Sequence, residues 1–146
     1  MSKVRHEAFI EAPVERIWEL VANLDRHPEW WPRIIATEAE RAAVGTTYRQ
    51  ELETPAGSEV SEFVVDGMED YKLLSIRCLN TGMFLRVGLT EARDGTFVQG
   101  EMGMDPIGIQ NRLFDAIGGR RYFRTWISET FAGLERAAKD RTTPVA

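Results

Sequence analysis

Alternating apolar and polar residues, interrupted by turn residues every 8 to 12 positions, occupy the chain from Arg33 to Met104. The interruptions fall at Gly45, TPAG (54–57), Gly67, NTG (80–82) and RDG (93–95). A period of two predicts strands, and turns at this spacing join consecutive strands into an antiparallel meander. We therefore expect strands over residues 33–43, 46–53, 58–66, 71–79, 83–91 and 96–104.

The N-terminal segment adds a further strand and two short helices. Residues 3–11 alternate in the same way and predict a strand. After Pro13, apolar residues recur at helical spacing, which predicts a short helix. The prolines at 28 and 32 limit the following segment to a short helical turn. His27, which precedes the first of them, is expected to be a surface or capping residue.

The C-terminal segment predicts one long helix. Phe123, Ile127 and Leu134 belong to an amphipathic stripe. Gly118 and Gly119 each cost a helix up to about 1 kcal/mol relative to Ala, so we expect a break or kink there. Residues 141–146 predict a flexible tail, which leaves a single domain over residues 1–140.

Composition excludes several classes of function. The chain has 146 residues and a net charge of −5, which argues against nucleic-acid binding. With one cysteine and two histidines it favours no metal site and no internal disulfide, and it contains no nucleotide-binding motif that would imply a cofactor. No apolar run reaches the roughly 18 residues of a spanning helix and no leader pattern is present, so we expect no integral membrane contact and a cytoplasmic location.

Two motifs near the N-terminus are the most specific local features, IEAPVERIW at 10–18 and DRHPEWWP at 25–32. Together with VGTTY at 44–48 and DGT at 94–96, they make the chain resemble the bacterial polyketide cyclase/dehydrase and lipid-transport family of the START-like (SRPBCC) superfamily. The resemblance implies an α+β helix-grip fold, in which a seven-stranded curved antiparallel sheet wraps around a long C-terminal helix. Because one helix cannot fill so long a concave face, we also expect an apolar cavity between them.

Strand alternation places several candidate residues around that cavity. Tyr48 and Gln50 oppose a charged face and are expected to point inward. Phe97, Gln99 and Glu101 are expected to do the same on their strand. The candidates on the two preceding strands are Arg77, Phe84 and Arg86. The charged members either form a buried polar cluster with Glu101 or lie in exposed cross-strand pairs, and the rarity of buried charges favours the second arrangement.

Aromatic and basic residues complete the candidates. Trp30 and Trp31 belong either to the core or to a cavity lid, while Phe123 and Trp126 are expected on the sheet-facing side of the helix. Three arginines, Arg120, Arg121 and Arg124, lie close together in GGRRYFR (118–124). They form either a solvated helix face or a docking site for a phosphate- or carboxylate-bearing ligand.

We expect the protein to bind a hydrophobic small molecule, such as a lipid, a quinone or an aromatic polyketide. The alternative is a polyketide cyclase, aromatase or dehydratase, with Glu101, His6 and Tyr48 as candidate acids or bases. His6 shares a strand face with apolar residues, where a histidine is more often a core residue. A protein-interaction module is a weaker alternative, favoured by a large exposed apolar patch. A homodimer is left open.

Overall fold

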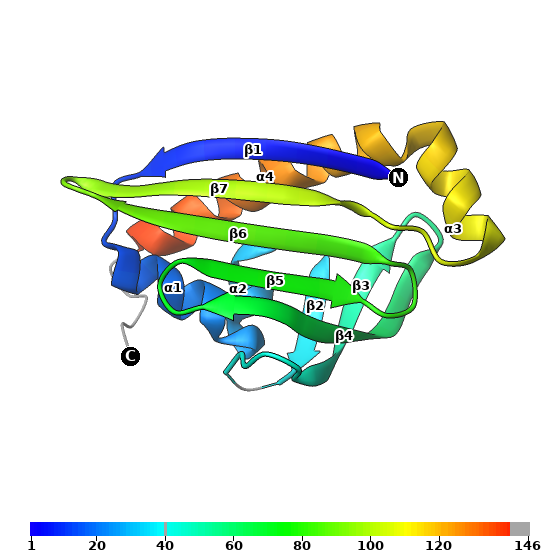
Figure 1. The fold of residues 1–146 in the computed structure, drawn as a ribbon, viewed down its shortest axis with the longest axis horizontal. Helices are drawn as coiled ribbons and strands as arrows, with labels where there is room; N and C mark the ends of the chain where they lie inside the picture. Colours follow the sequence, from blue (N-terminus) through cyan, green and yellow to red (C-terminus); the bar gives the residue numbers. More distant parts are fainter. Residues whose placement is uncertain (40, 141–146) are drawn as a thin grey trace.

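Seven antiparallel strands and a long C-terminal helix make up most of the computed structural model, which describes residues 1–39 and 41–140 (Figure 1). The N-terminal elements are β1 (Ser2–Ile10), α1 (Val14–Ala22), the 3-10 turn η1 (Leu24–Arg26) and α2 (His27–Trp30). The meander comprises β2 (Ile34–Glu38), β3 (Thr47–Thr54), β4 (Gly57–Glu69), β5 (Leu73–Cys78), β6 (Met83–Ala92) and β7 (Gly95–Met104). The C-terminal elements are α3 (Gly108–Phe114), the π-helical turn η2 (Asp115–Gly119) and α4 (Arg120–Lys139). The predicted tail, residues 141–146, lies outside the described residues.

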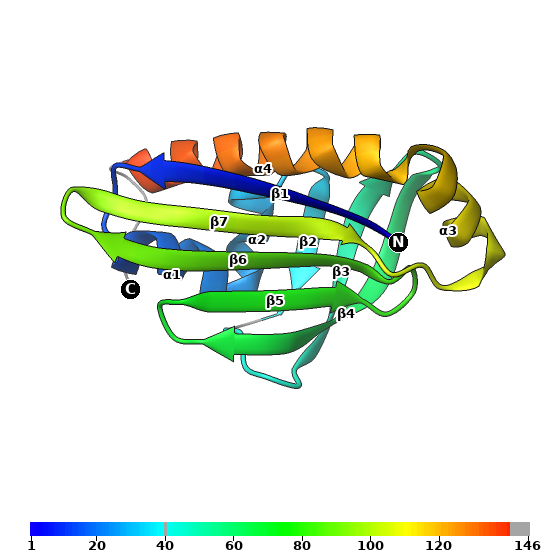
Figure 2. The ribbon, with the colours of Figure 1, turned by 45° about the horizontal axis from the view of Figure 1, so that its top comes forward.

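The strand order is β1-β7-β6-β5-β4-β3-β2, so consecutive strands of the meander are neighbours and β1 completes the sheet beside β7. Pairing of Val4 with Met102 and of Ile10 with Thr96 sets the β1–β7 register. Figure 2 shows the sheet curving from β1 round to β2, with α4 lying along β1. The helix packs against β1, β7, α1 and α2. This arrangement confirms the expected α+β helix-grip fold and its seven-stranded sheet.

The two short helices fill much of the concave side. Trp18 of α1 and Trp30 and Trp31, at the end of α2, are among the largest fully buried side chains. His27 is fully buried as well, and its Nε2 donates to the carbonyl of Val21 at 2.8 Å. The expected surface position of His27 is therefore wrong, because the turn after α1 folds back into the core. These side chains occupy one end of the concave side, and the pocket described below lies at the opposite end of the sheet.

The interruption expected at Gly118 and Gly119 is a single π-helical turn, not a break. Helix α3 enters this turn and α4 leaves it in a different direction (Figure 1). Asp115, buried within the turn, accepts a hydrogen bond from the Ser2 backbone N–H at 3.0 Å. A Cβ on Gly119 would lie 2.8 Å from Asp115 Oδ1. The turn is therefore anchored to the first residues of β1.

No helix among residues 1–39 and 41–140 is long and apolar enough to cross a membrane.

Candidate ligand pocket

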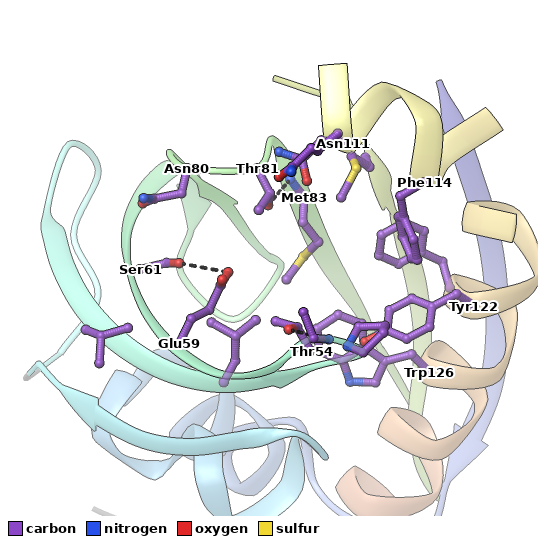
Figure 3. Close-up of a pocket in the computed structure, with 17 residues that line it drawn as sticks. Thr54, Glu59, Ser61, Asn80, Thr81, Met83, Asn111, Phe114, Tyr122 and Trp126 are labelled. Atoms are coloured by element: carbon purple, nitrogen blue, oxygen red, sulfur yellow. Dashed lines mark hydrogen bonds between the residues drawn. The ribbon is translucent and has the colours of Figure 1, made fainter. Parts of the chain in front are cut away.

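An open pocket of about 400 Å³ lies where α3 and the start of α4 approach the β3–β4 and β5–β6 turns (Figure 3). Its volume falls within the range of small-molecule sites. The helices contribute Gln110, Asn111, Phe114, Tyr122, Phe123 and Trp126. The sheet and its turns contribute Leu52, Thr54, Pro55, Ala56, Glu59, Val60, Ser61, Asn80, Thr81, Met83 and Met104.

The helix side of the pocket is an aromatic wall. Tyr122 meets Phe114 edge to face with ring centroids 5.3 Å apart, and Phe123 stacks on Trp126 at 6.2 Å. The indole Nε1 of Trp126 donates to the carbonyl of Pro32 at 2.7 Å, which fixes the ring. Aromatic pairs with these geometries attract each other beyond simple area burial. The wall is therefore a rigid apolar surface.

Arg33 braces the aromatic wall. Its guanidinium lies 4.7 Å from the ring centroid of Tyr122 and 5.5 Å from that of Trp126. The same group forms an ion pair with Glu129 at 2.9 Å. Arg33 has a φ of 75°, an uncommon conformation for a side chain of this size. Neither cation–π contact was expected from the sequence.

The sheet side of the pocket is mixed. Leu52, Met83 and Met104 supply apolar surface, whereas Glu59 and Ser61 extend into the hollow from β4. Ser61 Oγ donates to Glu59 Oε1 at 3.4 Å. Glu59 is the only carboxylate among the lining residues, and it is exposed. The pocket can therefore hold a flat apolar body against the helix and a polar group against the sheet.

Tyr48 and Gln50 point inward, as expected, but neither lines the pocket. Gln50 Oε1 accepts a hydrogen bond from Thr37 Oγ1 at 2.9 Å, while its Nε2 has no partner among the described residues. The Tyr48 hydroxyl has none there either. Burial, reinforced by the neighbouring Cys78 thiol, raises the pKa of Tyr48 far above its ordinary value. Burial therefore keeps the hydroxyl neutral at physiological pH.

The orientation expected for Phe97, Gln99 and Glu101 is wrong, because these side chains lie on the outer face of β7. Phe97 is 53% exposed and packs on Phe9 with ring centroids 5.1 Å apart. Glu101 Oε2 accepts a hydrogen bond from Arg5 Nε at 3.1 Å. The inner face instead carries Val98, Gly100 and Met102, where the absence of a side chain on Gly100 leaves room for the ring of Phe131.

Arg77, Phe84 and Arg86 also lie on the outer face, and none of them lines the pocket. For the two arginines this is the arrangement that the rarity of buried charges favoured, whereas the cavity position expected for Phe84 is wrong; its ring is buried on the outer face, at 5% exposed. The Arg77 guanidinium lies 5.4 Å from the Phe84 ring centroid and 3.5 Å from Asp66. Arg86 Nε donates to Ser75 Oγ at 3.2 Å. The proposed buried cluster with Glu101 is therefore absent.

Of the other candidates, Phe123 and Trp126 line the pocket and His6 does not. His6 is half-buried and faces α4, with its ring centroid 4.7 Å from that of Phe131. Trp30 and Trp31 lie in the core and do not form a lid. None of the three candidate acids or bases, Glu101, His6 and Tyr48, reaches the pocket.

Sequence reasoning missed the polar lining and part of the aromatic wall. Glu59 and Ser61 share the inward face of β4 with Phe63 and Val65, and this alternation is the signal that could have identified them. Phe114 and Tyr122 lie on opposite sides of the π turn, so helical spacing alone does not bring them together. No group of three or more potential metal ligands lies together within the described part of the chain.

Several solved structures share the fold of this chain. A START superfamily protein from Mycobacterium smegmatis superimposes with a TM-score of 0.77 at 14% identity, covering 97% of this chain and 100% of that one. A polyketide cyclase-like protein from Corynebacterium glutamicum gives 0.65 at 20% identity, with 92% and 89% covered. A protein from Chromobacterium violaceum gives 0.71 at 16%, with 94% and 97% covered.

The family model described as polyketide cyclase/dehydrase and lipid transport matches residues 1–139, so the chain belongs to this family. This confirms the resemblance carried by the N-terminal motifs. Among curated proteins, none matches the sequence significantly.

Proposed function

We propose that the protein binds a hydrophobic small molecule with a polar group, of the lipid, quinone or aromatic polyketide class, in the pocket between α3, α4 and the sheet. The observation that supports the proposal is that an aromatic wall and a polar wall face each other across the pocket. The aromatic residues Phe114, Tyr122 and Trp126 face Glu59 and Ser61 across the open space. A few placed polar groups in a largely apolar hollow orient a ligand without requiring chemistry.

A carrier or sensor role is favoured over catalysis. A general acid or base must lie within hydrogen-bond reach of the reacting group. Glu59 is the one carboxylate in the pocket lining, and neither histidine is there. If the protein were a cyclase, aromatase or dehydratase, Glu59 would be the carboxylate placed to transfer the proton, with the Tyr122 hydroxyl as the other titratable group in the lining. The cytoplasmic location, a homodimer and a protein-interaction role remain predictions from the sequence.

Quenching of tryptophan fluorescence by duroquinone tests the binding proposal. The probe is a fully methylated quinone, and Trp126 lies in the pocket wall. We expect saturable quenching by the wild-type protein. Replacing Phe114 by Ala removes part of the wall and should weaken binding by at least about tenfold, since burying an aromatic side chain against a ligand is worth about 1.5–3 kcal/mol.

The matched control is Leu113→Ala, one position away on α3, where the side chain is exposed and lines no part of the pocket. This variant should bind duroquinone as the wild type does. Quenching that is not saturable, or equal losses in both variants, would refute a binding site at this position. Native mass spectrometry of the purified protein would then identify any copurified natural ligand.

Substitution of Glu59 distinguishes a carrier from an enzyme. In a carrier, Glu59→Gln keeps the shape of the pocket and should change the affinity for duroquinone less than tenfold. A cyclase would lose turnover of a poly-β-ketone substrate in the same variant while retaining binding.

A further inference from the structure

Helix α3 carries an unpaired apolar stripe. Ile109, Leu113 and Ile117 are spaced by four residues, which places them in one row along the helix and its π turn. Their exposed fractions are 82%, 59% and 78%. Figures 1 and 2 show α3 at the end of the sheet, beyond the ends of β6 and β7. The stripe is thus a convex edge of the molecule, not a groove.

Arginines lie beside this stripe. Arg112, Arg120, Arg121 and Arg124 are all exposed, and none has a carboxylate within ion-pair distance among residues 1–39 and 41–140. Lys3 lies with Val4, Arg5, Arg120 and Arg124 around a hollow between β1 and the start of α4. This basic surface stands out on a chain whose net charge is −5.

We propose that this face docks onto an anionic lipid bilayer, with the Ile109–Leu113–Ile117 stripe in the headgroup region and the arginines on lipid phosphates. A helix with an apolar row flanked by basic residues lies in the plane of a membrane interface. Anionic lipids attract each nearby Arg or Lys at short range. The contact is peripheral, so it agrees with the absence of a spanning helix from the described residues.

Two other occupants fit the face less well. A second copy of the chain would bring the same arginines and no acidic row, so isologous pairing would leave like charges facing each other. An acidic protein would match the charge, but a protein partner would need a groove to receive a convex stripe. A bilayer adapts to a convex helix and supplies both the apolar and the anionic component.

The placement of the stripe connects docking to the pocket. Gln110, Asn111 and Phe114 of the same helix line the pocket, so the pocket mouth opens beside the docked face. On the opposite rim, Val60 is 55% exposed. A hydrophobic molecule could then pass between bilayer and pocket without crossing bulk water. Docking itself does not depend on the pocket being occupied, so the two proposals fail independently.

Vesicle flotation tests the docking. We expect the wild-type protein to float with vesicles of equal parts phosphatidylglycerol and phosphatidylcholine at low salt, and not with phosphatidylcholine alone. Raising the salt should release it, because surface charge attraction is screened. Arg120→Gln/Arg121→Gln/Arg124→Gln should lower the partition coefficient roughly 100-fold. Ile109→Gln/Leu113→Gln/Ile117→Gln should lower it at least about tenfold, since buried apolar area is lost.

Matched triple variants control for charge and apolar content. Arg49→Gln/Arg93→Gln/Arg136→Gln removes three exposed arginines elsewhere, and Ile35→Gln/Val44→Gln/Phe97→Gln removes three exposed apolar side chains elsewhere. Both should float as the wild type does, and circular dichroism should show every variant folded.

Failure of the wild-type protein to float with anionic vesicles overturns the proposal whatever the variants do. So does equal binding to both vesicle types without salt dependence, or equal loss in the control triples. If vesicles fail but an acidic acyl-carrier protein is bound through the same arginines, the face is a protein interface instead.

Discussion

His27 is fully buried, with its ring edge to face against Trp30 and Trp31 and its Nε2 donating to the Val21 carbonyl. Burial lowers its pKa to about 4, against an ordinary value of 6.5. Between these pH values the unfolded chain binds a proton that the folded chain does not. The contribution of His27 to the free energy of unfolding is therefore largest above pH 6.5. It decreases as the pH falls and becomes constant below pH 4.

The expected size of this effect is about 3 kcal/mol, because each pKa unit is worth about 1.4 kcal/mol. Carboxylates titrate in the same range, so urea unfolding of the wild type should be compared with that of His27→Gln. The variant loses packing and is less stable at neutral pH. The gap between the two proteins should narrow as the pH drops to 4. A constant gap would show that His27 takes up its proton at the same pH in the folded and the unfolded chain.

Tyr48 presents a buried hydroxyl without a partner among the described residues. An unsatisfied buried polar group costs free energy, and its removal from an otherwise unchanged ring is neutral or favourable. We expect Tyr48→Phe to leave the free energy of unfolding unchanged or to raise it by up to about 1 kcal/mol in urea titrations. A loss of more than about 1 kcal/mol would instead reveal a bound water or another partner for the hydroxyl.

For single residues, the sequence predicts correctly which side chains of β3 point inward, but it fails to do so for β7. On β3, charged residues occupy one whole face, so Tyr48 and Gln50 can only point inward. On β7, glycines and polar residues occur on both faces. What decides between them is the fit of Gly100 beneath Phe131, a contact between residues 31 positions apart. Alternation alone does not contain that information.

Two glycines of the C-terminal helical segment have opposite surroundings. A Cβ on Gly118 would meet nothing within 4 Å, whereas a Cβ on Gly133 would lie 2.2 Å from the carbonyl oxygen of Trp30. Ala is the better helix former by up to about 1 kcal/mol. Overpacking against a fixed carbonyl costs about 1–3 kcal/mol and outweighs that gain.

We therefore expect Gly118→Ala to raise the melting temperature and Gly133→Ala to lower it. Because both changes add one methyl group to a helix, each controls for the other in thermal unfolding followed by circular dichroism. Stabilisation by Gly133→Ala would show that α4 and α2 can move apart at no cost.

The π turn that contains Gly118 and Gly119 joins the two helices of the pocket wall, so a substitution there tests whether its bending admits the ligand. Gly118 is the position to replace, because Gly119→Ala would press on Asp115 and Ser2 while Gly118→Ala would not. We expect Gly118→Ala alone to stay folded and to slow the association of duroquinone in stopped-flow fluorescence if bending at the π turn admits the ligand. Unchanged association would mean that the turn is static.

The elements themselves follow closely from the sequence, since period-two alternation and turn residues predict every strand of the meander. The π turn does not, because its anchor joins Asp115 to Ser2, at the other end of the chain. The pocket could not be predicted from the sequence either, because its lining comes from segments that are far apart in the chain. It exists where α3 turns away from α4, and the rest of the concave side is filled by α1 and α2.

Cys78 offers a test of the molecule as a whole, because it is the only cysteine in the chain and its side chain is 1% exposed at the end of β5. Its inward face is shared with Phe63 and Tyr48 in the core, so a thiol reagent can reach it only after the sheet opens. Domains of this kind unfold with free energies of at least about 5 kcal/mol. We expect alkylation by iodoacetamide to be slower than in urea by a factor on the order of 10³ or more.

The same measurement links the fold to the pocket. If opening is global, the open state has no pocket, and a ligand at concentration [L] should slow alkylation by the factor 1 + [L]/Kd. With duroquinone at ten times its Kd, the rate should fall about elevenfold. At the same concentration Phe114→Ala, whose binding is at least about tenfold weaker, should be protected by no more than about twofold. Protection that does not follow the Kd from fluorescence would mean that β5 opens locally, with the pocket between α3 and the sheet still formed.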